Sequence, residues 1–242
     1  MSKPSGSLAP VLDPTRLPRH VGIIMDGNGR WARRQGKPRT EGHLEGVKAA
    51  KRVVAAASEI GLSYLSLYTF STENWTRAQD EVAYLMFLIK SYLKKEHDFY
   101  RENRIRIVHS GDLSRLPADI VEEIRTVSHD TAHFERLTVN LSINYGGRDE
   151  IIRAFRRYLD DPARGDLTEA SFRRYIDRPE IPDPDLVIRS GNEHRLSNFL
   201  LWESAYAELY FSTKLWPDWD GCDLAEAVAD YGRRSRRFGG AP

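Results

Sequence analysis

Charged and amide side chains follow directly after a short apolar run near the start of the chain. Residues 21–25 are largely β-branched and apolar, and Asp26-Gly27-Asn28-Gly29-Arg30-Trp31 comes next. Two glycines let the backbone turn sharply and present its N–H groups. A helix that opens behind such a turn places its positive dipole end beside a bound phosphate. The segment therefore predicts an anion-binding turn between a strand and a helix.

The aspartate of this turn fits two roles. A carboxylate beside a phosphate is repulsive unless a cation lies between them, and Mg²⁺ uses one or two carboxylates plus substrate phosphate oxygens. Asp26 could equally cap the following helix. The glycine spacing matches neither the GxGxxG nor the GxxxxGK[ST] pattern, so it indicates neither a dinucleotide fold nor a Walker loop.

Polar loops follow three further predicted strands, at residues 71–77, 144–148 and 189–195. Ligands of parallel sheets bind beyond the carboxyl ends of the strands, so four such loops at one edge predict an anion site. Arginine offers a fork of donors that matches phosphate, although a solvated position is the alternative for most single arginines. Arg189 is the exception, because it ends an apolar strand. The candidate cations are Arg30, Arg39, Arg77, Arg189 and Arg195, with His43 open to a structural or a phosphate-directed role.

Short β-rich runs alternate with longer helical patterns, which predicts a single α/β domain with a mostly parallel six-stranded sheet flanked by helices. We expect strands at 21–25, 64–70, 105–108, 137–143, 186–189 and 209–211. We expect helices near 41–60, 79–103, 117–134, 149–159, 168–177, 195–206 and 222–237.

One of these helices has no regular polar face. The run "VAYLMFLI" at 82–89 lacks the charge that a surface helix shows at every turn. It is therefore either a core helix or one wall of an apolar cavity. Next to a phosphate site, the second alternative suggests a ligand with a charged head and a hydrocarbon tail.

Composition narrows the class of protein and its compartment. The formal net charge of +1 argues against a general nucleic-acid binder, so any anion site must be a local cluster of positive charge. A single cysteine, Cys222, allows no intramolecular disulfide and favours a reducing compartment, which predicts a cytoplasmic protein. Residues 1–18 are proline-rich and predict a flexible lead, with the folded domain at 19–242.

Five stretches form a recognisable set: "HVGIIMDGNGRWA", "LYTFSTENWTR", "NYGGRDEI", "DLVIRSGNEHRLSNFLLW" and "AYAELYF". In order and spacing, over residues 19–240, this set resembles the cis-prenyltransferases, the family of undecaprenyl diphosphate synthase. The resemblance implies a homodimer with a hydrophobic tunnel. It also implies Mg²⁺-dependent condensation of isopentenyl diphosphate with an allylic isoprenyl diphosphate, giving a Z-configured polyprenyl or short-chain diphosphate. Contact with a membrane is expected only through the lipid product.

The resemblance also implies a role for each matching residue. Asp26 corresponds to the Mg²⁺-binding acid, with Glu208 as a second acid of the metal site. The allylic diphosphate pocket is matched by Gly27, Asn28, Gly29, Arg30, Trp31, Arg39 and His43. The loop over the substrates is matched by Ser71, Asn74, Trp75 and Arg77. Asp26 and Asn74 are the catalytic candidates, and the resemblance does not identify the base that removes the proton. The isopentenyl diphosphate grip is matched by Arg189, Arg195 and Ser197, and the tail that reaches the partner subunit by Arg237 and Gly239.

Two departures from the family pattern bear on the product. Asn192 stands where the family usually has glycine, so its side chain is expected to narrow the isopentenyl diphosphate pocket. Tyr84 and Phe87 are bulky for a long tunnel and predict a shorter product. Some relatives catalyse head-to-middle, lavandulyl-type coupling of isoprenyl diphosphates, and this reaction is the alternative function.

Overall fold

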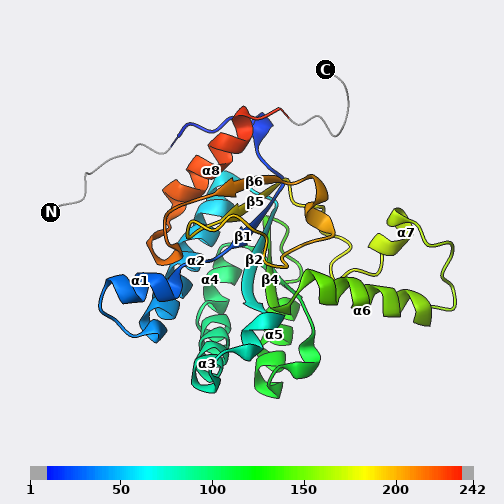
Figure 1. The fold of residues 1–242 in the computed structure, drawn as a ribbon. Coiled ribbons are helices and arrows are strands. Elements are labelled where there is room, and N and C mark those ends of the chain that lie inside the picture. Colours follow the sequence, from blue (N-terminus) through cyan, green and yellow to red (C-terminus); the bar gives the residue numbers. More distant parts are fainter. Residues whose placement is uncertain (1–9, 236–242) are drawn as a thin grey trace.

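The structure is a computed structural model that describes residues 10–235 of the chain. Its centre is one sheet of six parallel strands in the order β3-β4-β2-β1-β5-β6 (Figure 1). The strands are β1 His20–Ile24, β2 Tyr64–Ser71, β3 Ile105–Ser110, β4 Leu137–Tyr145, β5 Leu186–Arg189 and β6 Glu208–Phe211. The predicted parallel sheet is confirmed, and every predicted strand forms with small shifts at its ends.

The helices of the described residues alternate with these strands. They are α1 Asn28–Arg34, α2 Arg39–Ile60, α3 Gln79–Lys95, α4 His97–Glu102, α5 Ala118–Asp130, α6 Gly147–Asp160, α7 Glu169–Arg173 and α8 Gly221–Arg233. Local chemistry explains several ends. Gly61 ends α2 at φ 91°, a left-handed conformation that glycine adopts without a steric penalty. At the start of α8 the Asp220 carboxylate accepts the Cys222 N–H at 2.9 Å.

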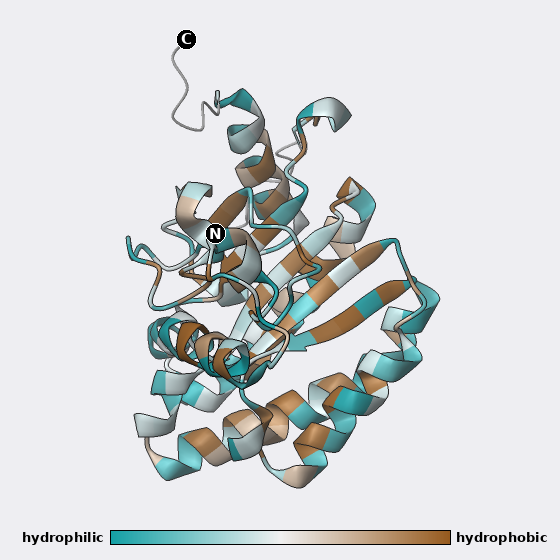
Figure 2. Ribbon diagram, turned by 90° about the vertical axis from the view of Figure 1, so that its right-hand side faces the viewer, coloured by the Kyte–Doolittle hydropathy of each residue, from teal (hydrophilic) through white to brown (hydrophobic). Residues whose placement is uncertain are grey.

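The two faces of the sheet are covered differently. Val21 and Ile23 of β1 join the main core, which also contains residues of α2, α3, α5 and α8. Ile24 points the other way and packs with Val187 and Phe199, from the irregular segment after β5. Both faces of the sheet are covered, and in Figure 2 brown apolar segments alternate with white and teal ones along the strands.

The predicted helix at 195–206 is wrong. Apart from the 3-10 turn Glu203–Tyr206, this segment is irregular. Ser197, Asn198 and Leu200 have φ of 48°, 67° and 45°, which a right-handed helix does not allow. Side-chain and backbone contacts described below hold these left-handed residues, and helix propensity carries no information about them.

The predicted long helix at 79–103 is divided at Glu96 into α3 and α4. The apolar run of α3 is also less buried than expected, because Phe87 is 62% exposed on its outer side, while Met86, Leu88 and Ile89 are buried. Among the described residues, no helix is both long enough and apolar enough to span a membrane.

Candidate active site at the carboxyl edge of the sheet

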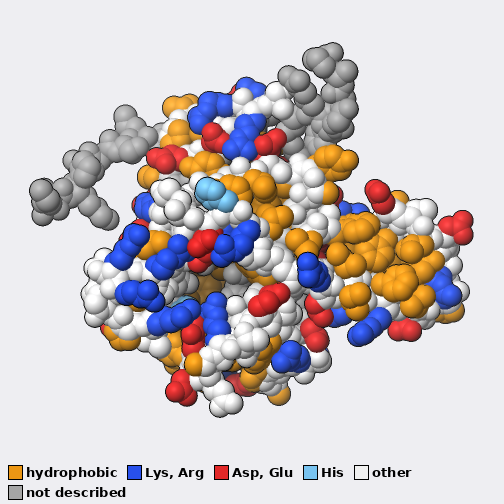
Figure 3. All heavy atoms as spheres, in the orientation of Figure 1, with side chains coloured by type: hydrophobic (Ala, Val, Ile, Leu, Met, Phe, Trp, Pro, Cys, Tyr) orange, Lys and Arg blue, Asp and Glu red, His pale blue; other side chains and the backbone are white. Residues whose placement is uncertain are grey.

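A cavity of about 670 Å³ opens at the carboxyl edge of the sheet, between the strand ends and helices α2 and α3. Figure 3 shows a hollow on this face with Lys and Arg side chains around it. The mouth is polar, and the interior is apolar. The polar lining includes Asp26, Arg39, His43, Ser71, Asn74, Arg77, Arg189, Arg195 and Ser197, and the apolar lining includes Val47, Leu67, Leu85, Leu88, Ile89, Tyr92, Leu141 and Ile143.

The turn after β1 has the conformation that its glycines predict. Gly27 has φ 111°, and a Cβ atom at this position would lie 2.8 Å from a side-chain carbon of Leu215. Helix α1 begins immediately afterwards, at Asn28. Asp26 does not cap this helix, since no side chain does, so the capping alternative for Asp26 is wrong.

The Asp26 carboxylate is instead paired with two arginines. Its Oδ2 atom lies 2.9 Å from Nη2 of Arg189, and its Oδ1 atom lies 3.2 Å from Nη2 of Arg30. Strand pairing causes the first contact, because β1 and β5 are adjacent and parallel with Ile24 opposite Arg189. Asp26, two residues after the end of β1, and Arg189, the last residue of β5, thereby face the same cavity.

Arg189 is the most deeply buried cation at the mouth, with 4% of its surface exposed. Its Nη1 donates to Ser197 Oγ at 2.7 Å and to the Arg195 carbonyl oxygen at 2.5 Å. These contacts, with Asp26, fix the plane of its guanidinium group. The solvated alternative, which applied to the other arginines, does not apply here.

The expected effect of Asn192 is wrong. Its side chain is exposed and does not line the cavity. Its backbone has φ 59°, a left-handed conformation in which asparagine is favoured after glycine. Its N–H donates to the Ser212 carbonyl at 2.8 Å, which turns the residue toward the end of β6 and away from the cavity.

Glu81 is a site residue that the sequence analysis missed. Its Oε1 atom lies 3.2 Å from Arg39 Nε, 3.3 Å from His43 Nε2 and 2.9 Å from Arg77 Nη1. Glu81 lies in the first turn of α3, four residues after Arg77, and this spacing was the signal available in the sequence. One carboxylate oxygen thus gathers the cationic side chains of α2 and of the loop after β2.

His43 is buried beside this acid. Burial lowers the pKa of His43, whereas the charge of Glu81 and its hydrogen bond raise the pKa. The lowering dominates, so the imidazole is neutral at ordinary pH and offers one donor and one acceptor.

Of the four residues predicted in the loop after β2, three reach the cavity and Trp75 does not. Ser71, Asn74 and Arg77 line the cavity. Asn74 Oδ1 accepts the Ser71 N–H at 3.1 Å, so the loop is closed on itself. Trp75 is directed to the neighbouring strand, where its Nε1 donates to Asn144 Oδ1 at 2.7 Å.

Several candidates lie apart from Asp26 within one copy of the chain. Trp31 donates to Asp218 at 2.7 Å and does not line the cavity. Glu208 begins β6 opposite Leu186, at the amino end of the sheet, and pairs with Arg234 at 2.8 Å. One chain therefore does not bring Glu208 to Asp26. Arg237 and Gly239 lie outside the described residues.

The donor set at the mouth is consistent with Mg²⁺ but not with a metal held by protein ligands alone. Within residues 10–235, no group of three or more His, Cys, Asp or Glu side chains could hold a metal ion. A single carboxylate beside phosphate-binding arginines is the pattern of an ion that takes most of its other ligands from substrate phosphates and water. Asp26 is the residue of this cavity that could supply that carboxylate.

Parallel strands, a cationic mouth and an apolar interior together define a site for a ligand with an anionic head and a hydrocarbon tail. Comparison with known proteins identifies the family. Residues 24–239 match the family model described as "Putative undecaprenyl diphosphate synthase". The chain belongs to this prenyltransferase family.

Individual relatives agree with this assignment. An isoprenyl transferase of Treponema denticola is 51% identical over 223 residues, covering 92% of this chain and 98% of the relative. A trans,polycis-polyprenyl diphosphate synthase of Thermobifida fusca, (2Z,6E)-farnesyl diphosphate specific, is 45% identical and covers 98% of this chain and 86% of its own. The crystal structure of lavandulyl diphosphate synthase from Lavandula x intermedia, in complex with dimethylallyl diphosphate, superposes with a TM-score of 0.87 at 33% identity, covering 93% and 99% of the two chains.

The contact between Glu81 and His43 gives a first prediction. Glu81→Gln removes the negative charge that raises the pKa of His43, so we expect that pKa to fall further. Proton NMR titration of the His43 ring measures it directly. Glu41→Gln, in the first turn of α2 but paired with Lys37, is the control and should leave the titration unchanged. An unaltered His43 pKa in Glu81→Gln would contradict the proposed contact.

Proposed function

We propose that this chain condenses isopentenyl diphosphate with an allylic isoprenyl diphosphate and forms a Z-configured prenyl diphosphate. The observation that carries the proposal is a single cavity that joins the Asp26–Arg189 pair to an apolar interior. The membership of the family and the relatives' names support it. A diphosphate needs several charge-assisted hydrogen bonds, each worth about 1.5–3 kcal/mol, and the mouth supplies several arginines.

The chain's own residues account for binding and orientation. Arg39, Arg77 and His43 hold the allylic diphosphate on the α2 and α3 side, and Arg189 and Arg195 hold isopentenyl diphosphate at the end of β5. Both hydrocarbon parts then enter the same cavity, which brings the double bond of one substrate to C1 of the other. Arginines that contact the departing diphosphate stabilise the negative charge that develops on it.

Mg²⁺ is the metal that we infer for this site, with Asp26 as its protein ligand. When bound, the ion would neutralise charge on a diphosphate leaving group. The participation of Glu208 requires a second copy of the chain, because one copy holds Glu208 at the far end of the sheet.

Asp26→Ala tests this role of the carboxylate. We expect turnover to fall by roughly a hundredfold or more, the scale of losing one group that stabilises transition-state charge. The circular dichroism spectrum should stay that of the native chain. Asp119→Asn, at a surface ion pair with Lys90, is the matched control. Turnover of Asp26→Ala within a few-fold of the wild type in Mg²⁺ would refute the assignment.

Head-to-middle coupling is the second candidate function, since the lavandulyl diphosphate synthase structure superposes closely on this chain. Incubation with dimethylallyl, geranyl or farnesyl diphosphate, each with and without isopentenyl diphosphate, separates the two reactions. Linear Z products that require isopentenyl diphosphate support the proposed function. Branched products that form without it support lavandulyl-type coupling instead.

We infer that neither Tyr84 nor Phe87 limits product length and that Tyr92 does. Neither of the first two lines the cavity. Tyr92 does, eleven residues beyond Glu81 on α3, or roughly 16 Å deeper at the helical rise per residue. The hydroxyl oxygen of Tyr92 is buried, and its ring packs edge-to-face against the ring of Tyr100, with 6.4 Å between the ring centroids.

Tyr92→Ala should therefore lengthen the products by at least one isoprenyl unit, because it opens space at the deep end of the cavity. Mass spectrometry of the product diphosphates measures the shift. Phe87→Ala, on the exposed side of the same helix, should leave the product distribution as it is. Identical distributions in Tyr92→Ala and the wild type would remove Tyr92 from this role.

We infer a homodimer from a face of α6 that no described residue covers. Ile152, Phe155 and Leu159 are 52%, 40% and 49% exposed, and their spacing places them on one side of the helix. Hydrophobic side chains gather over α6 in Figure 3. Exposed apolar patches of this kind mark interfaces between chains, and a second copy is the partner that the family resemblance implies.

Phe155→Asp should convert the dimer to a monomer, because it places a charge in the interface. Light scattering after size-exclusion chromatography gives the mass of each species. Phe87→Asp, at an exposed aromatic residue on α3, should remain a dimer. A wild-type chain that elutes as a monomer would contradict the inference.

Location in the cytoplasm and the absence of nucleic-acid binding stay predictions.

A further inference from the structure

The turn 197–200 is a strained segment at the mouth of the cavity. Three of its residues, Ser197, Asn198 and Leu200, have left-handed backbone conformations although none is glycine. Such conformations persist only where the surroundings over-determine them. Ser197 accepts the hydrogen bond from Arg189, so whatever fixes this turn also fixes the most buried cation of the site.

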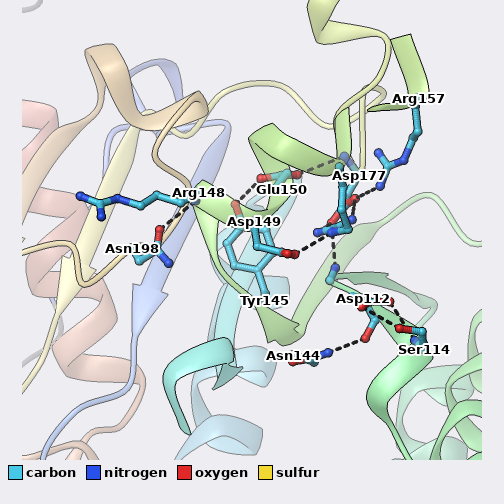
Figure 4. Close-up of polar contacts among 12 residues, drawn as sticks. Asp112, Ser114, Asn144, Tyr145, Arg148, Asp149, Glu150, Arg157, Asp177 and Asn198 are labelled. Atoms are coloured by element: carbon cyan, nitrogen blue, oxygen red, sulfur yellow. Dashed lines mark hydrogen bonds and ion pairs between the residues drawn. The ribbon is translucent and has the colours of Figure 1, made fainter. Parts of the chain in front are cut away.

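The amino end of α6 holds one side of the turn. The Gly147 N–H donates to the Asn198 carbonyl at 2.7 Å, and the Arg148 N–H donates to Asn198 Oδ1 at 2.9 Å, a contact visible in Figure 4. A Cβ atom at Gly147 would lie 2.8 Å from the Leu201 side chain, so the approach is close. The turn is therefore seated directly on α6.

An aromatic group holds the other side. Phe199 is fully buried and stacks on Tyr68 at 4.6 Å, while Tyr145 lies edge-on to Phe199 at 6.2 Å. The Tyr68 hydroxyl donates to the Ser197 carbonyl at 3.2 Å. Tyr145, the last residue of β4, thus connects the turn to Glu150 of α6.

Two buried carboxyl groups act on Tyr145 and on each other: Glu150 of α6 and Glu203 of the 3-10 turn, which are 1% and 8% exposed. The Tyr145 hydroxyl donates to Glu150 Oε2, and the Asp177 N–H donates to Glu150 Oε1 at 3.0 Å (Figure 4). Glu203 Oε2, in contrast, is buried and has no hydrogen-bond partner. Both carboxylate oxygens of Glu150 accept hydrogen bonds, as those of an anion do, whereas Oε2 of Glu203 accepts none.

Within residues 10–235, no ion pair joins a cation to either Glu150 or Glu203. Arg153 and Arg157 of α6 are paired with Asp177, and Arg153 also with Asp149. The other charged groups that act on the pair, Asp177 on Glu150 and Asp183 on Glu203, are acidic.

Burial, followed by the charge of Asp177, raises the pKa of Glu150. Burial, followed by the charge of Glu150, also raises the pKa of Glu203. Two carboxylates buried together without a cation cannot both be ionised.

We propose that Glu150 and Glu203 retain one proton between them, carried by Glu203, and that this singly charged pair positions the turn 197–200 through Tyr145 and α6. Glu150 and Glu203 are positioning residues, since neither lines the cavity. Loss of the proton would set two anions against each other between α6 and the segment that follows the turn. The hold on Ser197, and through it on Arg189, would then loosen.

Glu203→Gln keeps the size of the side chain and its neutral state, so it separates the proton from the shape. Infrared spectroscopy should show the carbonyl band of a buried protonated acid in the wild type, and this band should be missing in Glu203→Gln. The control Glu122→Gln, at an exposed position of α5, should retain it. Absence of the band from the wild type at neutral pH would overturn the proposal.

The melting temperature gives a second, independent readout. A carboxyl whose folded-state pKa is raised contributes stability at low pH and loses it as the pH rises through that pKa. We expect the Tm of the wild type to fall toward alkaline pH, and that of Glu203→Gln to fall less. Glu150→Gln should lower the Tm at neutral pH, because an amide cannot accept both hydrogen bonds. The opposite ranking of the two variants would place the proton on Glu150 and refute the assignment.

The positioning role rests on the proposed function and is tested with inorganic pyrophosphate. Calorimetry should show the wild type losing affinity by roughly tenfold more than Glu203→Gln as the pH becomes alkaline, the scale of one hydrogen bond to a charged group. Parallel pH dependences would refute the positioning role alone. If neither protein binds pyrophosphate at any pH, the proposed function fails, and the positioning role fails with it.

Discussion

The ion pair between Asp26 and Arg189 is the contact on which the site depends. An arginine that is 4% exposed requires compensation for its lost hydration, and the carboxylate of the adjacent strand supplies it at 2.9 Å. The pair exists because β1 and β5 are parallel neighbours whose last residues lie side by side. Exchanging the order of two strands would separate the acid from the cation without changing a residue of either loop.

The rest of the fold separates the ends of a two-part ligand. Cationic side chains lie at the carboxyl ends of the strands, on the first turn of α2 and just before α3, while the deeper turns of α3 present leucine, isoleucine and tyrosine to the same cavity. The small net charge of the chain conceals this local arrangement. Glu81 maintains it, because one carboxylate bridges Arg39 and Arg77, which would otherwise repel each other, and also contacts His43.

Much of this arrangement follows from the sequence, since apolar strands and the polar loops after them are local patterns. The meeting of polar loops at one edge needs only the rule for parallel sheets, whereas the order of the strands was not predicted. What the sequence did not indicate depends on contacts between distant segments. Residues 195–206 have adequate helix formers, yet the left-handed Ser197 and Leu200 arise from contacts with α6 and β2. Phe87 belongs to an apolar run, but only the packing of α3 decides which side of that run faces the cavity.

The molecule compensates the carboxyl groups of Asp26 and Glu203 in two different ways. Asp26 is balanced by guanidinium groups, which leaves it charged and able to accept a metal ion when a diphosphate engages those arginines. Among residues 10–235, the charged groups that act on Glu203 are acids, so a proton on Glu203 does what the arginines do for Asp26. The first arrangement keeps a charge available at the cavity mouth, and the second removes one from the scaffold behind it. Because Ser197 touches Arg189 and its neighbour Phe199 touches Tyr145, the turn 197–200 links the two, and the geometry of the charged site depends on the neutrality of the buried one.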